Sequence, residues 1–159
     1  MFRQSWDTGI SLIQWNLVKS EAGVLRGVHV HPRHDDYLTI VDGSATIGLR
    51  DLRKDSPTEG NVLMIDVSSE VLEPLVIPHG VAHGFLFHEP SIGVYSVSHY
   101  WDTADEVACL WSDPDLEMKW PYEPKLISER DSSAQSLTEL LDEIEPHQPI
   151  SLLEPHPES

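Results

Sequence analysis

Between Ile10 and Leu110, short runs of β-branched and aromatic residues alternate with polar turns. Side chains in a strand point alternately to the two faces of a sheet, so runs of this length predict a sandwich or small barrel. The predicted strands are Ile10–Val18, Tyr37–Val41, Ala45–Leu49, Val62–Val67, Pro74–Ile77, Gly84–Phe87 and Ile92–Ser98. We therefore expect an all-β fold.

Two polar segments mark turns in this pattern. Asp42-Gly43 separates two predicted strands, and this pair commonly supplies the positive φ angles of a tight hairpin turn. Arg53–Gly60 is rich in polar residues and contains both Pro and Gly, which is typical of a loop. The sequence thus predicts a hairpin at Asp42-Gly43 and a longer loop after the strand that follows it.

The pattern changes after Pro121. Apolar residues recur at helical spacing at positions 137, 140, 141 and 144, and Ser136 with Glu139 matches a capping box. This predicts one amphipathic helix at Ser136–Glu145. We expect one domain at residues 1–131, a helical segment at 132–146 that packs on it, and a flexible proline-rich tail at 147–159.

Charge and cysteine content narrow the function. The chain carries 27 Asp and Glu against 10 Lys and Arg, a formal charge of −17, which argues against binding to nucleic acid or to an acidic membrane surface. Cys109 is the only cysteine, so it forms no intrachain disulfide, and we expect a small core residue in a reducing compartment. No apolar run approaches the length of a membrane helix, and we expect a cytoplasmic protein.

The candidate chemistry is concentrated in residues 23–43, GVLRGVHVHPRHDDYLTIVDG. His29 and His31 are one residue apart, so on a strand they share a face and can meet one ligand. His34 fits no such pattern; we predict a structural or exposed residue, with a spare metal ligand as the alternative. Three further positions, Asp36, Gly43 and the Pro78–His83 segment, follow at spacings that resemble the two motifs of the cupin superfamily. In metal-binding cupins such positions hold a transition metal, which implies His29, His31, Asp36 and His83 as ligands here.

A closer resemblance runs from Gln14 to Asp131 and is to the dTDP-4-dehydrorhamnose 3,5-epimerase family. Its landmarks occur in order: Gln14-Trp15-Asn16, Gly23–His29, Asp51–Arg53 before Asp55–Gly60, Ile77–Phe85, Val94-Tyr95, Asp113-Pro114, Trp120-Pro121 and Ser128–Asp131. The resemblance implies a cupin jelly-roll barrel of antiparallel strands with a short C-terminal helix, and a homodimer. It also implies proton abstraction next to the 4-keto group of a nucleotide-linked 6-deoxyhexose, in deoxysugar or polysaccharide synthesis.

The same resemblance implies roles for single residues. His29 is the expected general base, oriented by Asp131, and Tyr95 is the expected acid. Substrate binding is expected from Arg26 at the diphosphate, from Gln14, Asn16 and His83 nearer the sugar, from Trp101 near the nucleotide base, and from Arg130. This mechanism uses no cofactor.

One departure from the family keeps two alternatives open. The family has a lysine where this chain has Asp36, and that lysine stabilises the enolate. The chain also resembles a member shortened at its N-terminus. One alternative is therefore a metal-dependent cupin, acting as an oxygenase, isomerase or lyase with one divalent transition metal ion. The other is a non-catalytic protein that binds sugar nucleotides. The metal and epimerase readings compete for the same lone pair of His29.

Overall fold

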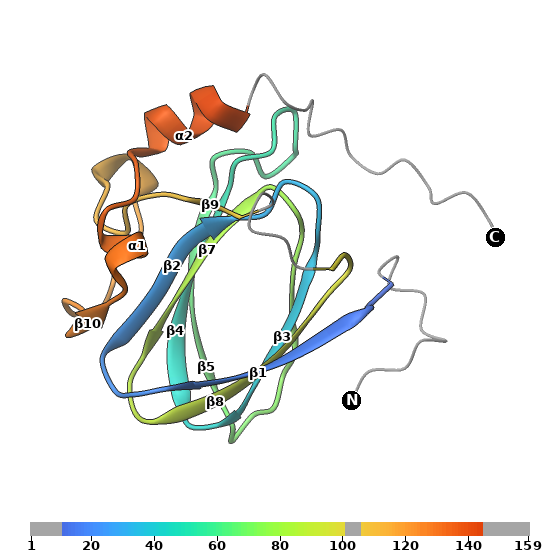
Figure 1. Cartoon of the computed structure of the whole chain (residues 1–159), viewed down its shortest axis with the longest axis vertical. Coiled ribbons are helices and arrows are strands. Elements are labelled where there is room, and N and C mark those ends of the chain that lie inside the picture. Colours follow the sequence, from blue (N-terminus) through green and yellow to red (C-terminus); the bar gives the residue numbers. More distant parts are fainter. Residues whose placement is uncertain (1–10, 101–105, 145–159) are drawn as a thin grey trace.

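Two facing β-sheets form the molecule in a computed structural model that describes residues 11–100 and 106–144. In spatial order, the four-stranded sheet contains β1 (Gln14–Ser20), β8 (Ser91–Val97), β3 (Asp36–Asp42) and β6 (Leu75–Ile77) (Figure 1). The six-stranded sheet contains β10 (Leu126–Ile127), β2 (Val24–Val30), β7 (Val81–Phe87), β4 (Ser44–Asp51) and β5 (Val62–Ser68), and β9 (Val107–Ala108) pairs with β2. Among these described strands, every pair is antiparallel except β10 with β2. The prediction of an all-β jelly-roll barrel is confirmed.

The segment around Asp42-Gly43 makes a tight turn, but the predicted hairpin is wrong. β3 pairs with β6 and β8, whereas β4 pairs with β5 and β7, so the turn carries the chain from one sheet to the other. Only Gly43 of the two residues has a positive φ, at 82°. A Cβ atom there would lie 2.8 Å from the carbonyl oxygen of Pro90, so glycine is required at this crossing.

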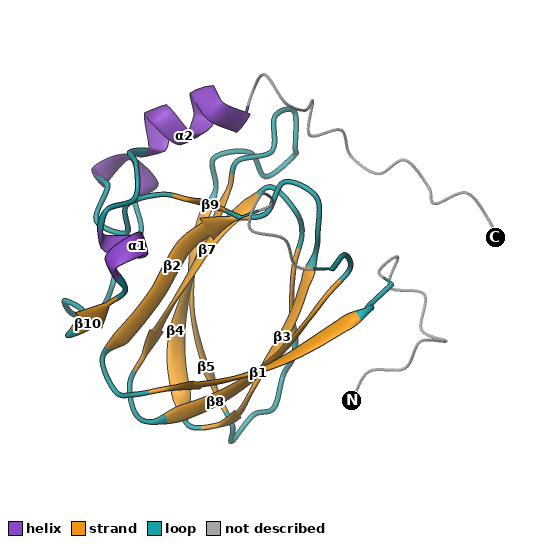
Figure 2. Cartoon of the chain, viewed as in Figure 1, coloured by secondary structure: helices purple, strands orange, loops and turns teal. Residues whose placement is uncertain are grey.

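The C-terminal segment covers the outer face of the six-stranded sheet (Figure 2). It contains a 3-10 helix at Pro114–Leu116, then α1 (Glu129–Ser132) and α2 (Leu137–Ile144). The predicted helix and its capping box are confirmed, since Ser136 N donates to Glu139 Oε2 at 2.9 Å and Glu139 N donates to Ser136 Oγ at 3.3 Å. The segment expected at 132–146 does not form a single helix. Its first residue, Ser132, is the last residue of α1, and α2 begins only at Leu137. The tail predicted at 147–159 lies outside the described residues.

The apolar side of α2 packs on residues of β2 and β7 that point away from the barrel interior. Leu137, Leu140 and Ile144 join one core cluster with Val28 and Val30. Cys109 belongs to the same cluster, is fully buried, and has a thiol pKa that burial raises to about 12. This agrees with the predicted core role. None of the described helices is long and apolar enough to span a membrane.

Candidate functional site

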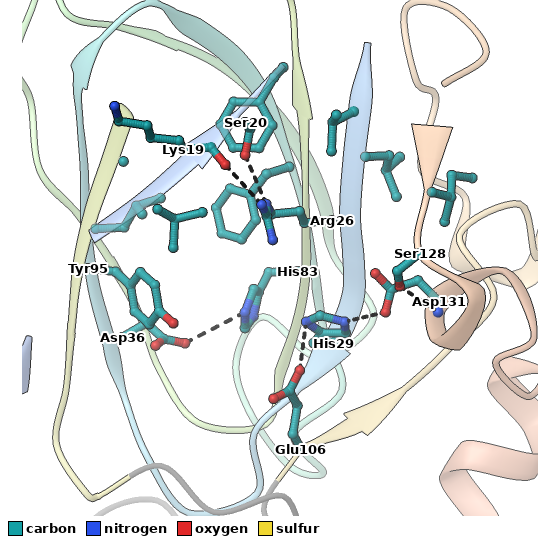
Figure 3. A pocket seen from close by; sticks show the side chains of 18 of the residues that line it. Lys19, Ser20, Arg26, His29, Asp36, His83, Tyr95, Glu106, Ser128 and Asp131 are labelled. Carbon is teal, nitrogen blue, oxygen red and sulfur yellow. Dashed lines mark hydrogen bonds and ion pairs between the residues drawn. The ribbon is translucent and has the colours of Figure 1, made fainter. Parts of the chain in front are cut away.

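A cavity of about 800 Å³ lies between the two sheets and is closed at one side by α1 and β10. Most residues that carried the sequence prediction line it, among them Arg26, His29, His83, Tyr95 and Asp131. Figure 3 shows His29 and Asp131 on one side of this space, and Tyr95 with Asp36 on the other. Residues far apart in the sequence therefore meet around one volume.

His29 and Asp131 form a direct pair, although 102 residues separate them. His29 Nε2 lies 2.8 Å from Asp131 Oδ1, and Gly27 N donates to Asp131 Oδ2 at 3.3 Å. Gly27 has a φ of 108°, and a Cβ atom there would lie 2.7 Å from the carbonyl oxygen of His83. Ser128 caps α1 by accepting from Asp131 N, which fixes the backbone that carries the carboxylate.

The Asp131 carboxylate is held in its ionised form. Burial alone would raise its pKa, but the hydrogen bond and charge of His29, with the bond from Gly27 N, outweigh burial and hold the pKa well below its usual range. An ionised carboxylate on Nε2 orients the imidazole and stabilises its protonated form. The nitrogen available for proton transfer in the cavity is then Nδ1.

Two further charged residues surround the imidazole. Glu106 Oε1 lies 3.2 Å from His29 Nδ1, and Arg130 bonds to Glu106, with its Nη2 2.7 Å from His29 Nε2. Arg130 also donates from Nε to Asp131 Oδ1 at 3.3 Å. The sequence analysis placed Arg130 near the substrate but gave no role to Glu106, which carries no motif of its own.

Tyr95 presents its hydroxyl from β8, on the opposite sheet. Burial raises its pKa, and the charges of Asp36 and Glu106 raise it further against the opposing effect of Arg26. The phenol therefore keeps its proton at neutral pH, as an acid must. Base and acid candidates thus lie on opposite walls of the same cavity.

A third group lies deeper in the wall and consists of His31, His34, His83 and Asp36. All four side chains are buried. His83 Nδ1 lies 3.0 Å from the carbonyl oxygen of Val81, which can only accept, so Nδ1 carries the proton and Nε2 faces Asp36. Burial lowers the pKa of His83 to about 4, so this imidazole is neutral at pH 7. A group of imidazoles and a carboxylate is a donor set that transition metals accept.

Positive charge gathers at another part of the cavity. Arg26 Nε donates to Ser20 Oγ at 2.9 Å, and its Nη2 donates to the carbonyl oxygen of Lys19 at 3.1 Å. The backbone of Lys19 borders this region, as do the rings of Phe85 and Phe87, whereas the Lys19 side chain is on the exposed side of β1. A guanidinium beside apolar rings suits a ligand that carries both phosphate and a flat base.

The remaining predicted binding residues do not join this lining. Gln14 Nε2 donates to Asn16 Oδ1 at 3.0 Å on β1, and neither residue is among the described residues that line the cavity. Trp101 lies outside the described residues. The sequence analysis gave no role to Glu106 and named Ser128 only as part of a family landmark, without its capping contact to Asp131.

The chain is similar in sequence to known sugar-nucleotide epimerases. A sequence profile of the dTDP-4-dehydrorhamnose 3,5-epimerase family matches residues 2–139. The dTDP-4-dehydrorhamnose 3,5-epimerase of Shigella flexneri is 32% identical over 143 residues, which cover 87% of this chain and 79% of that protein. A dTDP-4-dehydrorhamnose 3-epimerase of Streptomyces niveus is 33% identical over 148 residues, covering 89% and 70%.

Solved structures of epimerases are also similar to this chain. The crystal structure of the dTDP-6-deoxy-D-glucose-3,5-epimerase of Legionella pneumophila, in complex with dTDP-4-keto-L-rhamnose, superposes with a TM-score of 0.78. It is 28% identical, and the match covers 85% of this chain and 74% of that one. On the family profile and these relatives, the chain belongs to the dTDP-4-dehydrorhamnose 3,5-epimerase family.

Proposed function

We propose that the protein is an isomerase that inverts a carbon next to the 4-keto group of a nucleotide-linked 6-deoxyhexose. The observation that carries this proposal is the placement of an Asp131-held imidazole and a protonated phenol on opposite walls of one cavity. Inversion requires a proton to leave one face of a carbon and another to arrive at the opposite face. A base and an acid on facing sheets meet that requirement.

The steps follow from the positions of the side chains. His29 Nδ1 takes the proton from the carbon, and the C–H electron pair moves into a carbon–carbon double bond while the keto oxygen becomes an enolate. Asp131 stabilises the imidazolium that forms. Tyr95 then donates its proton to the opposite face of the same carbon, and the carbonyl re-forms. Glu106, 3.2 Å from Nδ1, is placed to accept the proton from His29 afterwards.

The substrate class is supported by the cavity and by the relatives. Arg26 offers positive charge to a diphosphate, and Phe85 and Phe87 offer apolar surface to a base. The Legionella relative was solved with dTDP-4-keto-L-rhamnose, and the Shigella relative is named for dTDP-4-dehydrorhamnose. We therefore propose a dTDP-linked 4-keto-6-deoxyhexose as the substrate.

The test is turnover of dTDP-4-keto-6-deoxyglucose by purified protein, with the epimeric products separated by chromatography. The His29→Asn variant should lose turnover by about 10³-fold, because it removes the base while keeping a side chain of similar size. His88→Asn is the matched control, since His88 bonds Thr46 and Tyr122 and does not line the cavity. Equal turnover by wild type and His29→Asn would overturn the proposal.

We also propose that the protein is a homodimer joined through the outer face of the four-stranded sheet. Trp15 and Leu17 on β1, Val41 on β3 and Val76 on β6 are exposed, with relative exposures between 39% and 66%. Contiguous apolar surface of this kind on a sheet typically marks an interface. Because β1 lies at the edge of its sheet, a second copy would also cover an exposed strand.

A further inference from the structure

Three imidazoles surround one carboxylate in the cavity wall. His31 Nε2 lies 3.5 Å and His83 Nε2 lies 3.6 Å from Asp36 Oδ2, and His34 Nε2 lies 3.8 Å from Asp36 Oδ1. The side chains come from three parts of the fold: Asp36 from β3, His83 from β7, and the other two from the connection between β2 and β3. This group is distinct from the pair that His29 forms with Asp131.

The distances from the three imidazoles to Asp36 approach those between ligands of one ion. Two donor atoms that each lie about 2.1 Å from a tetrahedral ion are about 3.4 Å apart. The nitrogen-to-oxygen distances of 3.5 to 3.8 Å are slightly longer, and the donor atoms of His31, His34 and Asp36 all lie within 4.8 Å of one another. A shift of a few tenths of an ångström would therefore bring each nitrogen to its ligand distance from the Asp36 oxygens. His83 is not in the group of donor atoms that lie within 4.8 Å of one another, so its imidazole has to move farther to share an ion with His31 and His34.

The burial and the outer contacts of the group also fit a metal site. The relative exposures of His31, His34, Asp36 and His83 are 8%, 2%, 6% and 4%. His83 directs Nε2 at the group while its Nδ1 donates to the carbonyl oxygen of Val81. Metal-binding imidazoles almost always donate their second nitrogen to such an acceptor, which fixes the tautomer and the ring orientation.

His29 does not join this group, although the cupin resemblance implied it as a ligand. Its Nε2 is occupied by Asp131 at 2.8 Å, and its Nδ1 lies 3.2 Å from Glu106. His34, which the sequence analysis treated as a spare, completes the set of three imidazoles instead. The competition between metal ligation and base catalysis for one lone pair is thereby removed, because the two tasks fall to different histidines.

We propose that His31, His34, Asp36 and His83 bind one divalent first-row transition metal ion. Imidazole and carboxylate donors suit ions of this class. The consequence for catalysis rests on the proposed function: positive charge in this wall would lie beside Tyr95, in the cavity where the keto oxygen gains negative charge (Figure 3). The binding itself does not depend on the identity of the substrate.

The test uses cobalt chloride as the probe with the full chain, purified without a histidine tag and freed of metal by a chelator. Wild type should bind about one equivalent and develop the visible absorption bands of a four- or five-coordinate cobalt ion. His34→Ala and Asp36→Asn should each weaken binding by more than about tenfold. His29→Asn should bind as wild type does, and thermal melting should establish that each variant is folded.

The outcomes separate this proposal from the proposed function, since cobalt binding is read without substrate. Absence of bands in wild type, unchanged binding in both His34→Ala and Asp36→Asn, or loss of binding in folded His29→Asn would each overturn the metal site. Wild type that binds cobalt but does not turn over the sugar nucleotide would support the metal site and overturn the epimerase proposal. Turnover without cobalt binding would do the reverse.

Discussion

The Asp131 carboxylate accepts from the backbone of Gly27 and the imidazole of His29, while Arg130 bonds its Oδ1. These contacts fix the carboxylate, so the carboxylate in turn fixes the imidazole. Only an acceptor at this position selects the tautomer that carries its proton on Nε2 and leaves Nδ1 basic. The charge and the geometry of one side chain thus determine which nitrogen of another can react.

Asp131→Asn should separate that role from simple packing. The amide has nearly the same shape, but its nitrogen would donate toward Nε2 and favour the opposite tautomer. We expect kcat to fall by about 10³-fold while the melting temperature changes little. Steady-state kinetics beside thermal denaturation measure both. A kcat within twofold of wild type would show that Asp131 does not support the base.

Tyr95→Phe should divide the reaction into its two halves. The base remains, so the substrate hydrogen should still exchange with solvent from the His29 face, while inversion should fall by about 100-fold for want of the acid. The KM should stay near that of wild type, because phenylalanine keeps the ring. Parallel measurement of exchange by NMR and of inverted product by chromatography makes the comparison. An equal loss of hydrogen exchange and of inversion would contradict the assignment of the base and the acid to opposite walls of the cavity.

For single residues, the sequence predicted which residues belong to the site better than it predicted which of them contact one another. The pairing of His29 with Asp131 and the role of Tyr95 came only from the family resemblance, since nothing in spacing joins residues 102 positions apart. The metal-ligand set was predicted with His29 because period-two alternation places it on the same face as His31. β2 ends at Val30, however, so His31 lies beyond the strand, and the turn that follows brings His34 to Asp36 instead.

At the level of elements, the loop between β4 and β5 is organised by Asp51. Its carboxylate accepts from Arg53 Nε and Nη2 at 2.9 and 2.7 Å, from Thr58 Oγ1 at 2.6 Å and from Ser56 Oγ at 2.8 Å. Burial alone would raise the pKa of Asp51, but these donors outweigh burial and hold it well below its usual range. The loop thereby gains a fixed shape without a hydrophobic core of its own.

This pKa gives stability a defined pH dependence. The folded pKa of Asp51 is below the ordinary pKa of an aspartate side chain, about 4, so its contribution to stability is present above about pH 4 and is lost as the pH falls through the folded pKa. Asp51→Asn should cost about 2 kcal/mol at pH 7 and less at pH 3. Urea unfolding at several pH values measures this difference. A cost that stays constant or grows on acidification would contradict the account.

The strands and turns also show which elements the sequence pattern could predict and which it could not. Runs of β-branched and aromatic residues between turns located β3, β4, β5, β7 and β8 to within a few residues. Three strands were missing from the predicted list: β2, and the two-residue strands β9 and β10, which are too short to carry a period. The turn at Gly43 was recognised but misread as a hairpin, because local turn chemistry does not reveal that the chain changes sheets there.

For the whole molecule, the two outer faces of the barrel differ in what covers them. α2 and the preceding segment pack on the six-stranded sheet, whereas apolar residues on the four-stranded sheet remain exposed. Leu17→Glu should therefore convert a dimer into a monomer, because the charge would be buried at the proposed interface. Light scattering gives the mass directly.

Leu63→Glu is the matched control for that prediction. Leu63 is 55% exposed and lies on β5, in the other sheet, whereas Leu17 is 66% exposed. Both substitutions add the same charge to an exposed strand position. If both variants keep the mass of wild type, or if Leu63→Glu alone dissociates the protein, the proposed interface is wrong.

The central claim is that His29 removes a proton from carbon in a nucleotide-linked 4-keto sugar. The most direct measurement is deuterium incorporation, followed by NMR, when wild type and His29→Asn are incubated with dTDP-4-keto-6-deoxyglucose in heavy water. The account predicts rapid loss of the proton signal at a carbon beside the keto group with wild type, and exchange near the background rate with His29→Asn. No enzyme-dependent exchange with wild type, or equal exchange with the variant, would contradict it.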